Sequence, residues 1–382
     1  MSVDVFFIIA ASVIFLLAIA TPLANPFFVW NRRKSIASTI PSSQLSPPPV
    51  SIIIIPNRNA QALRKHLPVI LQQEYEGDMQ VIIVTEKGDV ETEDALAAFG
   101  TDSRIYVTYI PESSRYISRK KLAITIGVKA AKYEWVVLLD AESCPESSHW
   151  LSTLSRNFTP DKNLVLGYCH TPEATPFQQF YKLRLVRQLM RQATPWRALG
   201  GNLAFRKSLF LDRHGYRHNL QFVGGEYDFL VSLFAAKEST AIETSSNGYV
   251  KEDASTKRRW RNSQLQYLSI RSELKNTTLP RMRFNTEYAL MFLTDIAMLA
   301  GLLTPFLPLS SIKWIIFGVS LLSIFVNTFL RIRFAKKTAE DFNEDLSMFM
   351  IPFYERAIPP HNLLRLYQYT RSDKIDYSTH KV

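Results

Sequence analysis

Two acidic residues, Asp140 and Glu142, follow the run EWVVLLD (134–140), with Ala141 between them. The run is almost continuously apolar, which is typical of a strand buried on both faces of a sheet. Mg²⁺ and Mn²⁺ are bound in proteins by one or two carboxylates, together with waters and substrate phosphate oxygens. The pair therefore predicts a Mg²⁺ or Mn²⁺ site that neutralises the charge on a departing diphosphate. A solvated acidic turn, with Glu142 capping the next helix, is an alternative that the spacing alone leaves open.

Strand and helix patterns alternate on the N-terminal side of this pair. Four strands are expected, at 50–56, 79–85, 104–110 and 134–140, and three helices, at 60–73, 90–100 and 118–132. This alternation predicts an α/β fold with a mainly parallel sheet. Ligands of such sheets lie beyond the carboxyl ends of the strands. The candidate site is therefore built from the loops 56–59, 85–89, 111–114 and 140–144.

Composition and charge exclude several classes of protein. The 382 residues include 47% hydrophobic residues, 45 basic and 34 acidic side chains, and a formal charge of +11, which is not the composition of a disordered chain or a collagen-like fibre. Cys144 and Cys169 are too few for a disulfide framework or a four-thiolate zinc site. The segment PNRNAQ after the first strand holds no glycine, which excludes a G-x-G-x-x-G dinucleotide site there.

Three nearly uncharged segments are candidates for transmembrane helices, near 5–24, 286–305 and 314–331. About 20 apolar residues are enough to cross a hydrocarbon layer of roughly 30 Å, although a buried core helix is an alternative for each segment. Asp295 lies within the second segment, where it is either functional or bonded near the interface, for example to Thr294.

Basic residues flank these segments and predict their orientation. Arg32, Arg33 and Lys34 follow the first, Arg281 and Arg283 precede the second, and Arg331, Arg333, Lys336 and Lys337 follow the third. The positive-inside rule then places the N-terminus outside the cell and the large domain in the cytoplasm, at the plasma (inner) membrane. The expected organisation is a transmembrane helix (1–31), a linker (32–48), a cytoplasmic domain (49–275), a transmembrane hairpin (285–331) and a cytoplasmic or interfacial tail (332–382).

Three stretches together resemble the membrane-bound, bacterial-type family 2 inverting glycosyltransferases, which have the GT-A fold. PPPVSIIIIPNRNAQALRKHLPVILQQEYEGDMQVIIV is similar to the opening of that family. SRKKLAITIGVKAAKYEWVVLLDAESCPESSHWL resembles its K-x-x-A-L helix and its metal-binding D-x-D segment, and PWRALGGNLAFRKSLF resembles its acceptor-side segment. The resemblance runs from about residue 48 to 270. It implies that Pro56, Glu86, Lys120 and Asp140 bind the nucleotide-sugar donor, that Asp140 and Glu142 bind Mg²⁺ or Mn²⁺, and that Gly200, Gly201 and Asn202 line the acceptor side.

The sequence departs from the family pattern at two functional positions. The second strand ends in Thr85-Glu86-Lys87 where the family usually has Asp-Asp, which leaves the identity of the base open. The catalytic-base segment reads GGEYDFL, with Tyr227 in place of the usual aspartate. Tyrosine, with a pKa near 10, is a poor base at neutral pH, so Asp228 is the first candidate for the base and Glu226 the second. Both carboxylates are also explained by a helix start that they stabilise.

The segment TKRRWRNSQ (256–264) resembles the Q-x-x-R-W segment of polysaccharide synthases, with Thr256 in place of Gln. Arg259 and Trp260 are therefore expected to bind diphosphate and stack on the acceptor, although a basic stripe on anionic lipid is equally consistent.

The resemblance predicts a metal-assisted hexosyltransferase that uses a nucleotide-diphosphate sugar, most simply a UDP-sugar. Its acceptor would be lipid-linked or a growing glycan, its partners would include the membrane, and no nucleic acid would bind. A catalytically inactive scaffold in a glycan assembly complex is the main alternative, and a transport protein is a weaker one.

Overall fold

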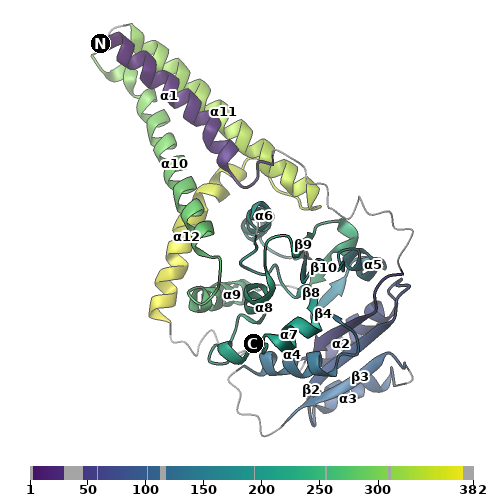
Figure 1. The fold of residues 1–382 in the computed structure, drawn as a ribbon. Coiled ribbons are helices and arrows are strands. Elements are labelled where there is room, and N and C mark those ends of the chain that lie inside the picture. Colours follow the sequence, from purple (N-terminus) through teal and green to yellow (C-terminus); the bar gives the residue numbers. More distant parts are fainter. Residues whose placement is uncertain are drawn as a thin grey trace. The chain divides into compact units, whose positions relative to one another are not determined.

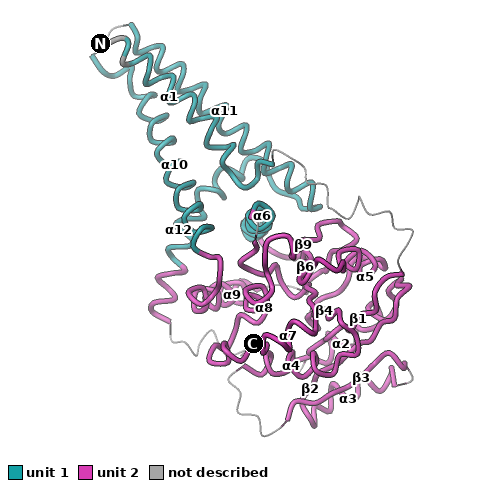
Figure 2. Tube along the Cα trace, in the orientation of Figure 1, with its two compact units in different colours: residues 1–32, 176–191, 278–364 teal, residues 33–175, 192–277, 365–382 magenta. Residues whose placement is uncertain are grey.

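The computed structural model describes residues 3–29, 46–57, 59–100, 102–111, 118–192, 194–253, 256–308 and 311–372. The chain divides into two compact units, shown in Figure 2. Unit 1 comprises residues 1–32, 176–191 and 278–364, and unit 2 comprises residues 33–175, 192–277 and 365–382. The basic cluster Arg32 to Lys34 and most of the expected linker (32–48) lie outside the described residues.

Unit 2 is built on a central sheet whose strand order, within the described residues, is β3-β2-β1-β4-β8-β6-β9 (Figure 1). The strands are β1 (Val50–Ile55), β2 (Met79–Glu86), β3 (Ile105–Ile110), β4 (Trp135–Asp140), β6 (Leu164–Gly167), β8 (Asn202–Arg206) and β9 (Thr240–Glu243). β1 to β4 pair in parallel, whereas β8 runs antiparallel to both β4 and β6. The predicted mainly parallel α/β sheet is therefore confirmed.

Buried β-branched and aliphatic side chains explain why these strands are central. Residues 50–54 and 81–85 are buried without interruption, as expected of strands covered on both faces. The helices of this unit are α2 (Ala60–Leu71), α3 (Val90–Ala97), α4 (Arg119–Ala130), α5 (Trp150–Ser155), α7 (Lys207–Asp212), α8 (Glu226–Phe234) and α9 (Lys257–Ile270). The sequence-based bounds of the first three differ from these by at most three residues.

A small second sheet, with the order β5-β10-β7, lies after the end of β4 in the chain. Its strands are β5 (Ser143–Pro145), β10 (Val250–Glu252) and β7 (Cys169–His170). β10 pairs antiparallel with β5 and parallel with β7. This sheet joins the loop after Asp140 to the segment that leads into α9.

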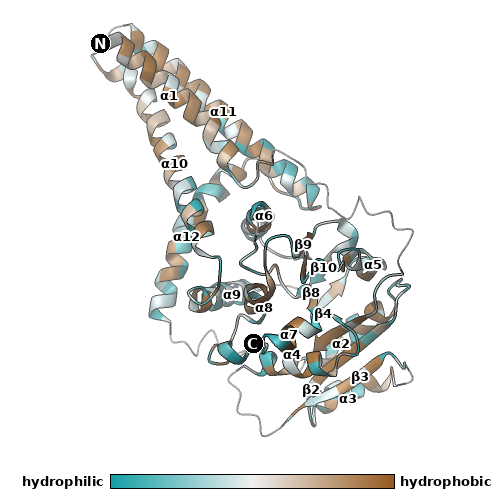
Figure 3. Ribbon diagram, viewed as in Figure 1, coloured by the Kyte–Doolittle hydropathy of each residue, from teal (hydrophilic) through white to brown (hydrophobic). Residues whose placement is uncertain are grey.

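Unit 1 consists of helices α1 (Val3–Ala24), α6 (Pro176–Arg191), α10 (Thr278–Leu302) and α11 (Ile312–Asp341), with most of α12 (Ile351–Arg371). Within the described residues, α1 and α11 are long and apolar enough to cross a membrane (Figure 3). Only 22% and 28% of their apolar windows is buried, which is low for core helices of a soluble protein. The third expected span is not supported, because Glu287, Asp295 and several polar residues lower the hydropathy of α10.

Helix α6 was not expected in unit 1, because it lies within the predicted 49–275 domain. Its arginines bind the other helices of this unit: Arg184 pairs with Glu287 of α10 at 2.7 Å, and Arg187 pairs with Asp341 of α11 at 2.6 Å. The sequence pattern of α6 is that of an ordinary surface helix, so the grouping depends on partners more than 100 residues away in the chain.

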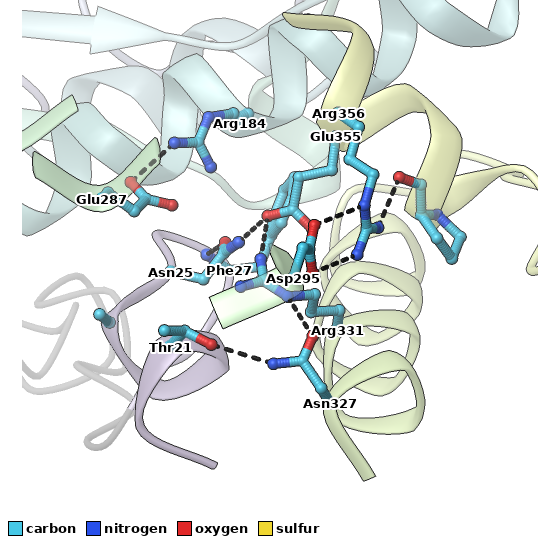
Figure 4. Close-up of polar contacts among 12 residues, drawn as sticks. Thr21, Asn25, Phe27, Arg184, Glu287, Asp295, Asn327, Arg331, Glu355 and Arg356 are labelled. Carbon is cyan, nitrogen blue, oxygen red and sulfur yellow. Dashed lines mark hydrogen bonds and ion pairs between the residues drawn. The ribbon is translucent and has the colours of Figure 1, made fainter. Parts of the chain in front are cut away.

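A buried ionic network connects the helices of unit 1 (Figure 4). Arg331 on α11 pairs with Glu355 on α12 at 2.7 Å, and both side chains are 2% exposed. Asn25, just after α1, also donates to Glu355. Asp295 on α10 accepts two bonds of 2.9 Å from Arg356. Asp295 is therefore paired with an arginine and not bonded to Thr294, and Arg331 is not a free charge at the end of a span.

Breaking the Arg331–Glu355 pair is expected to destabilise the protein strongly. Arg331→Met leaves a buried, uncompensated carboxylate, which typically costs about 3–5 kcal/mol. The double variant Arg331→Met/Glu355→Leu removes both charges and is expected to lose much less. Thermal unfolding in detergent measures this, with the exposed Lys336–Asp345 pair as the control. A double variant less stable than Arg331→Met would contradict the assignment.

Candidate active site

A pocket opens at the carboxyl ends of β1, β2 and β3, where the sequence predicts a nucleotide site. Its polar lining residues are Asn57, Thr85, Glu86, Asp89, Arg119 and Lys120. Asn57 has φ 51°, a left-handed conformation that turns the chain sharply after β1. Arg119, in the first turn of α4, lies 3.1 Å from the Glu86 carboxylate. Glu86 and Lys120 therefore lie where they were predicted, whereas Pro56 is buried beside the pocket and is not among its lining residues.

Asp140, at the end of β4, is contacted by side chains from two helices. Its Oδ1 accepts a 2.7 Å bond from the Lys120 ammonium and a short bond from the Tyr227 hydroxyl. Burial raises the pKa of Asp140, but the Lys120 charge and the bonds from Lys120 and Tyr227 outweigh it, so the net pKa lies below its usual range. Asp140 is therefore ionised at neutral pH and held in one orientation.

The sequence indicates that Tyr227 is a poor base, but it does not predict the hydrogen bond from the Tyr227 hydroxyl to Asp140. Burial and the Asp140 charge raise the pKa of its hydroxyl well above the ordinary value, so it stays protonated and donates. The Lys120 ammonium lies 4.6 Å from the centre of the Tyr227 ring, a cation–π distance. The departure from the family pattern thus places a fixed hydrogen-bond donor on Asp140.

The glycines of the acceptor-side segment approach this centre closely. A Cβ at Gly201 would lie 2.3 Å from Asp140 Oδ2, so no larger residue fits there. Gly200 has φ 143°, and a Cβ there would lie 2.6 Å from Cys169 Sγ. Both positions therefore need glycine for the main chain to pass this close to Asp140 and Cys169.

Asn202 differs from the prediction that it lines the acceptor side. Its side chain is buried at 1% exposure, with Nδ2 donating to the carbonyls of Tyr168 and Gly248. Its Oδ1 accepts from the indole of Trp150. Because all of its amide groups are bonded inside the protein, Asn202 positions the glycine segment and does not face an acceptor.

Glu142 has two partners from distant parts of the chain. Its Oε1 accepts a 3.1 Å bond from Asn59, and its Oε2 is in a close ion pair with Arg259 at the start of α9. Among the described residues, no group of three or more His, Cys, Asp or Glu side chains could hold a metal ion. Two carboxylates of this kind still fit Mg²⁺ or Mn²⁺, which take their remaining ligands from water and phosphate. Metal binding by Asp140 and Glu142 stays a prediction.

The two candidate bases lie in the first turn of α8, as predicted. Asp228 Oδ1 accepts a 2.9 Å bond from the backbone N–H of Ala198, and Arg197 lies 3.9 Å from Oδ2. Burial raises the pKa of Asp228 above the ordinary value, against the opposing effects of Arg197 and the Ala198 N–H. Glu226 Oε1 accepts a 3.3 Å bond from Ser118. A carboxylate with a raised pKa is a better base than a surface aspartate.

The indole ring of Trp260 is in contact with a guanidinium group. The guanidinium of Arg365 lies 5.5 Å from the ring centre, and Arg365 also donates to Gln264 on the same helix as Trp260. Arg259 and Trp260 are therefore adjacent on α9 but engaged differently, Arg259 by Glu142 and Trp260 by Arg365.

Comparison with known proteins bears on residues 47–207, which match the family model described as Glycosyltransferase like family 2. This region is a glycosyltransferase family 2-like domain. The matched region runs from just before β1 to the start of α7, so it contains Asp140, Glu142 and the glycine segment but not α8 or α9. The family 2 resemblance inferred from the sequence is therefore supported over residues 47–207, and not over 208–270.

Further comparisons were made with curated proteins and with solved structures. No curated protein matches the sequence. Among solved structures, the chain is similar to the mannosyltransferase PcManGT from Pyrobaculum calidifontis, in complex with GDP-Man and Mn²⁺. The two are 18% identical over 85% of this chain and 97% of that chain, with a TM-score of 0.49.

Proposed function

We propose that this protein is a membrane-bound inverting glycosyltransferase that moves a hexosyl group from a nucleotide-diphosphate sugar to a lipid-linked or growing glycan acceptor. The observation that carries the proposal is the convergence on Asp140 of three otherwise distant elements: Lys120 from α4, Tyr227 from α8, and Gly201 next to β8. A family 2-like domain with an ordered carboxylate beside a pocket at the strand ends is suited to holding a donor diphosphate.

The donor would bind with its base in the pocket of Glu86 and Arg119. A carboxylate accepts from the ring N–H of uracil, and the guanidinium donates to a neighbouring carbonyl. A UDP-sugar is our first choice of donor. Guanine presents the same pair of groups, so a GDP-sugar is the second. Lys120 lies between this pocket and Asp140, where its ammonium can bind a phosphate oxygen.

In the transfer step, the acceptor hydroxyl loses its proton to Asp228 as its oxygen attacks the anomeric carbon. The bond from that carbon to the diphosphate oxygen breaks on the opposite face, so the configuration inverts. Asp140 and Glu142 would hold Mg²⁺ or Mn²⁺, which when bound would act as a Lewis acid and stabilise the charge on the departing diphosphate. Lys120 and Arg259 add positive charge at the same place, and Gly201 leaves room for close approach.

The proposal is tested with the full-length protein in detergent or nanodiscs. Binding and hydrolysis of UDP-, GDP- and ADP-hexoses are measured with Mn²⁺, with Mg²⁺ and with chelator. We expect metal-dependent binding of one nucleotide class and slow release of the free sugar. Binding without turnover, with acceptor lipids present, would favour the inactive scaffold, which Tyr227 at the usual aspartate position also favours. No binding of any sugar nucleotide would overturn both.

We propose further that α1 and α11 span the membrane, that α10 crosses it beside them with Asp295 paired to Arg356, and that unit 2 lies in the cytoplasm. Single cysteines are introduced at Ser42 and Ser310, which lie outside the described residues, after Cys144 and Cys169 are replaced by serine. An impermeant maleimide is expected to label Ser310→Cys from outside intact cells and Ser42→Cys only after permeabilisation. Labelling of both from the same side would contradict the topology.

A further inference from the structure

Lys121, the residue after Lys120, is fully buried, and among the described residues it has no hydrogen bond to a carboxylate. It is 0% exposed and ranks among the largest fully buried side chains of the described residues. Burying an ammonium is costly unless its hydrogen bonds are satisfied. Its ammonium donates to two backbone carbonyls, those of Asn219 at 2.9 Å and Phe222 at 2.6 Å. It also lies 4.6 Å from the centre of the Phe229 ring.

These partners surround the start of the helix that bears the candidate bases. Asn219 ends a 3₁₀ turn (Arg217–Asn219), and Phe222 lies four residues before Glu226, where α8 begins. Phe229 is on α8 itself, and its ring packs 5.6 Å from that of Phe222. Lys121 therefore binds both the loop that leads into α8 and one face of α8.

Besides its bonds to Lys121, the loop packs against α9, where an added Cβ at Gly224 or Gly225 would meet Gln266 or Ile270. The Phe222 N–H reaches the Asn219 carbonyl at 3.3 Å, and Gly225, which precedes α8, has φ 79°. A glycine in the left-handed region is easily rearranged, since it has no Cβ to restrict it. Charged donors form stronger hydrogen bonds than neutral ones, so the Lys121 ammonium is well suited to fix such a segment.

We propose that Lys121 is a positioning residue that fixes the 219–225 loop and, through it, the placement of Glu226 and Asp228 at the acceptor. The inference rests on the proposed transferase function for its kinetic consequence, but not for its structural one. Lys120 and Lys121 then divide two tasks on one turn of α4: the first contacts Asp140 at the donor site, and the second holds the base segment.

The Lys121 ammonium loses its proton at a pH closer to neutrality than an ordinary lysine does. Burial lowers the pKa of Lys121 to about 8, against the attraction of Glu226 on α8. Of the other charged or titratable groups at this place, Lys120 is bonded to Asp140, and the Tyr216 hydroxyl donates to the Glu226 carbonyl. Between about 8 and the ordinary value of 10.5, the unfolded chain binds more protons than the folded one, so stability contributed by this group rises with pH. Deprotonation of Lys121 over that window would therefore not itself destabilise the fold.

The kinetic test compares Lys121→Met, Lys121→Gln and the control Lys129→Met, an exposed lysine on the same helix. Lys121→Met is expected to lower kcat about 10²-fold, the scale for a misplaced catalytic group, with donor binding unchanged. Lys121→Gln keeps two N–H donors and should lose less. In the wild type, kcat should fall as pH rises through about 8, and Lys121→Met should lack that limb. Unchanged kcat in Lys121→Met, or an equal loss in Lys129→Met, would overturn the proposal.

Hydrogen exchange gives a readout that does not need activity. Amides of residues 219–225 should exchange faster in Lys121→Met, while those of β1 and β4 keep their protection. Uniformly faster exchange would mean that Lys121 supports the whole fold, and unchanged exchange in the loop would mean that it positions nothing; both outcomes overturn the inference. If the wild type transfers no sugar at all, the proposed function fails while this measurement still decides the role of Lys121.

Discussion

Asp140→Asn is expected to abolish metal-dependent donor binding and to lower transfer by on the order of 10³-fold. The carboxylate at the end of β4 loses the charge that suits a divalent cation, and the Lys120 ammonium, 2.7 Å away, loses its counter-ion. The amide keeps nearly the same shape, so the close fit against Gly201 and the surrounding sheet should survive. Titration calorimetry with the sugar nucleotide, with and without Mn²⁺, measures the effect.

Two further variants make this result specific. Asp161→Asn removes a carboxylate that is 64% exposed and distant in sequence from the pocket, so donor binding should not change. Tyr227→Phe removes one of the two contacts to Asp140 Oδ1 and should weaken binding by about 10- to 150-fold, since a hydrogen bond to a charged group contributes about 1.5–3 kcal/mol. Donor affinity that is unchanged in Asp140→Asn with metal present would refute the assignment.

Asp228→Asn is expected to lower kcat by about 10²–10⁴, the usual effect of removing a general base, with donor binding intact. The carboxylate is the one charged side chain in the first turn of α8 that is held by a backbone N–H, that of Ala198. Burial raises the pKa of Asp228, so its ionised form destabilises the folded protein at neutral pH. The free energy of unfolding therefore falls as pH rises from the ordinary pKa of 3.8 through the raised pKa. Asp228→Asn should therefore keep or increase the free energy of unfolding at pH 7.

The matched variant is Glu226→Gln, in the same turn of the same helix. It is expected to lose less activity, because Glu226 is bonded to Ser118 and lies toward α4. An inactive Glu226→Gln beside a nearly normal Asp228→Asn would exchange the two roles. If both variants keep full activity, the segment is only a helix start and the base lies elsewhere.

Local sequence patterns were sufficient to predict the central strands and the first helices of unit 2. Continuous β-branched runs predicted β1, β2 and β4 to within a residue or two, because a strand covered on both faces has no other composition. Parallel strands bring their carboxyl ends to one edge, so Glu86 and Asp140 were expected at the same edge of the sheet. The start of α8 at Glu226 followed from acidic residues ahead of an apolar run.

Apolar length was a less reliable guide to the membrane segments. Within the described residues, α1 and α11 are apolar enough to span a membrane, whereas Glu287 and Asp295 lower the hydropathy of α10. Both carboxylates pair with arginines on other helices of unit 1. The position of Arg331 was also predicted incompletely from the sequence. A basic residue after an apolar run predicts the cytoplasmic end of a span. In the structure, α11 continues to Asp341, and the Arg331 guanidinium is buried against Glu355. A charge count along the chain does not distinguish a solvated arginine from a paired one.

The sequence by itself determined the α/β class and the strand ends that carry the acidic residues, because apolar runs and their alternation with helical patterns are local properties of the chain. Tertiary structure alone decided which side chains meet. Tyr227 reaches Asp140 across 87 residues, Arg259 reaches Glu142, and Asn202 turns inward to the carbonyls of Tyr168 and Gly248. The Lys121 ammonium likewise finds carbonyls about 100 residues away. Hydrophobic periodicity reports which face of an element is buried, whereas the partner of a buried polar group depends on how separate elements pack.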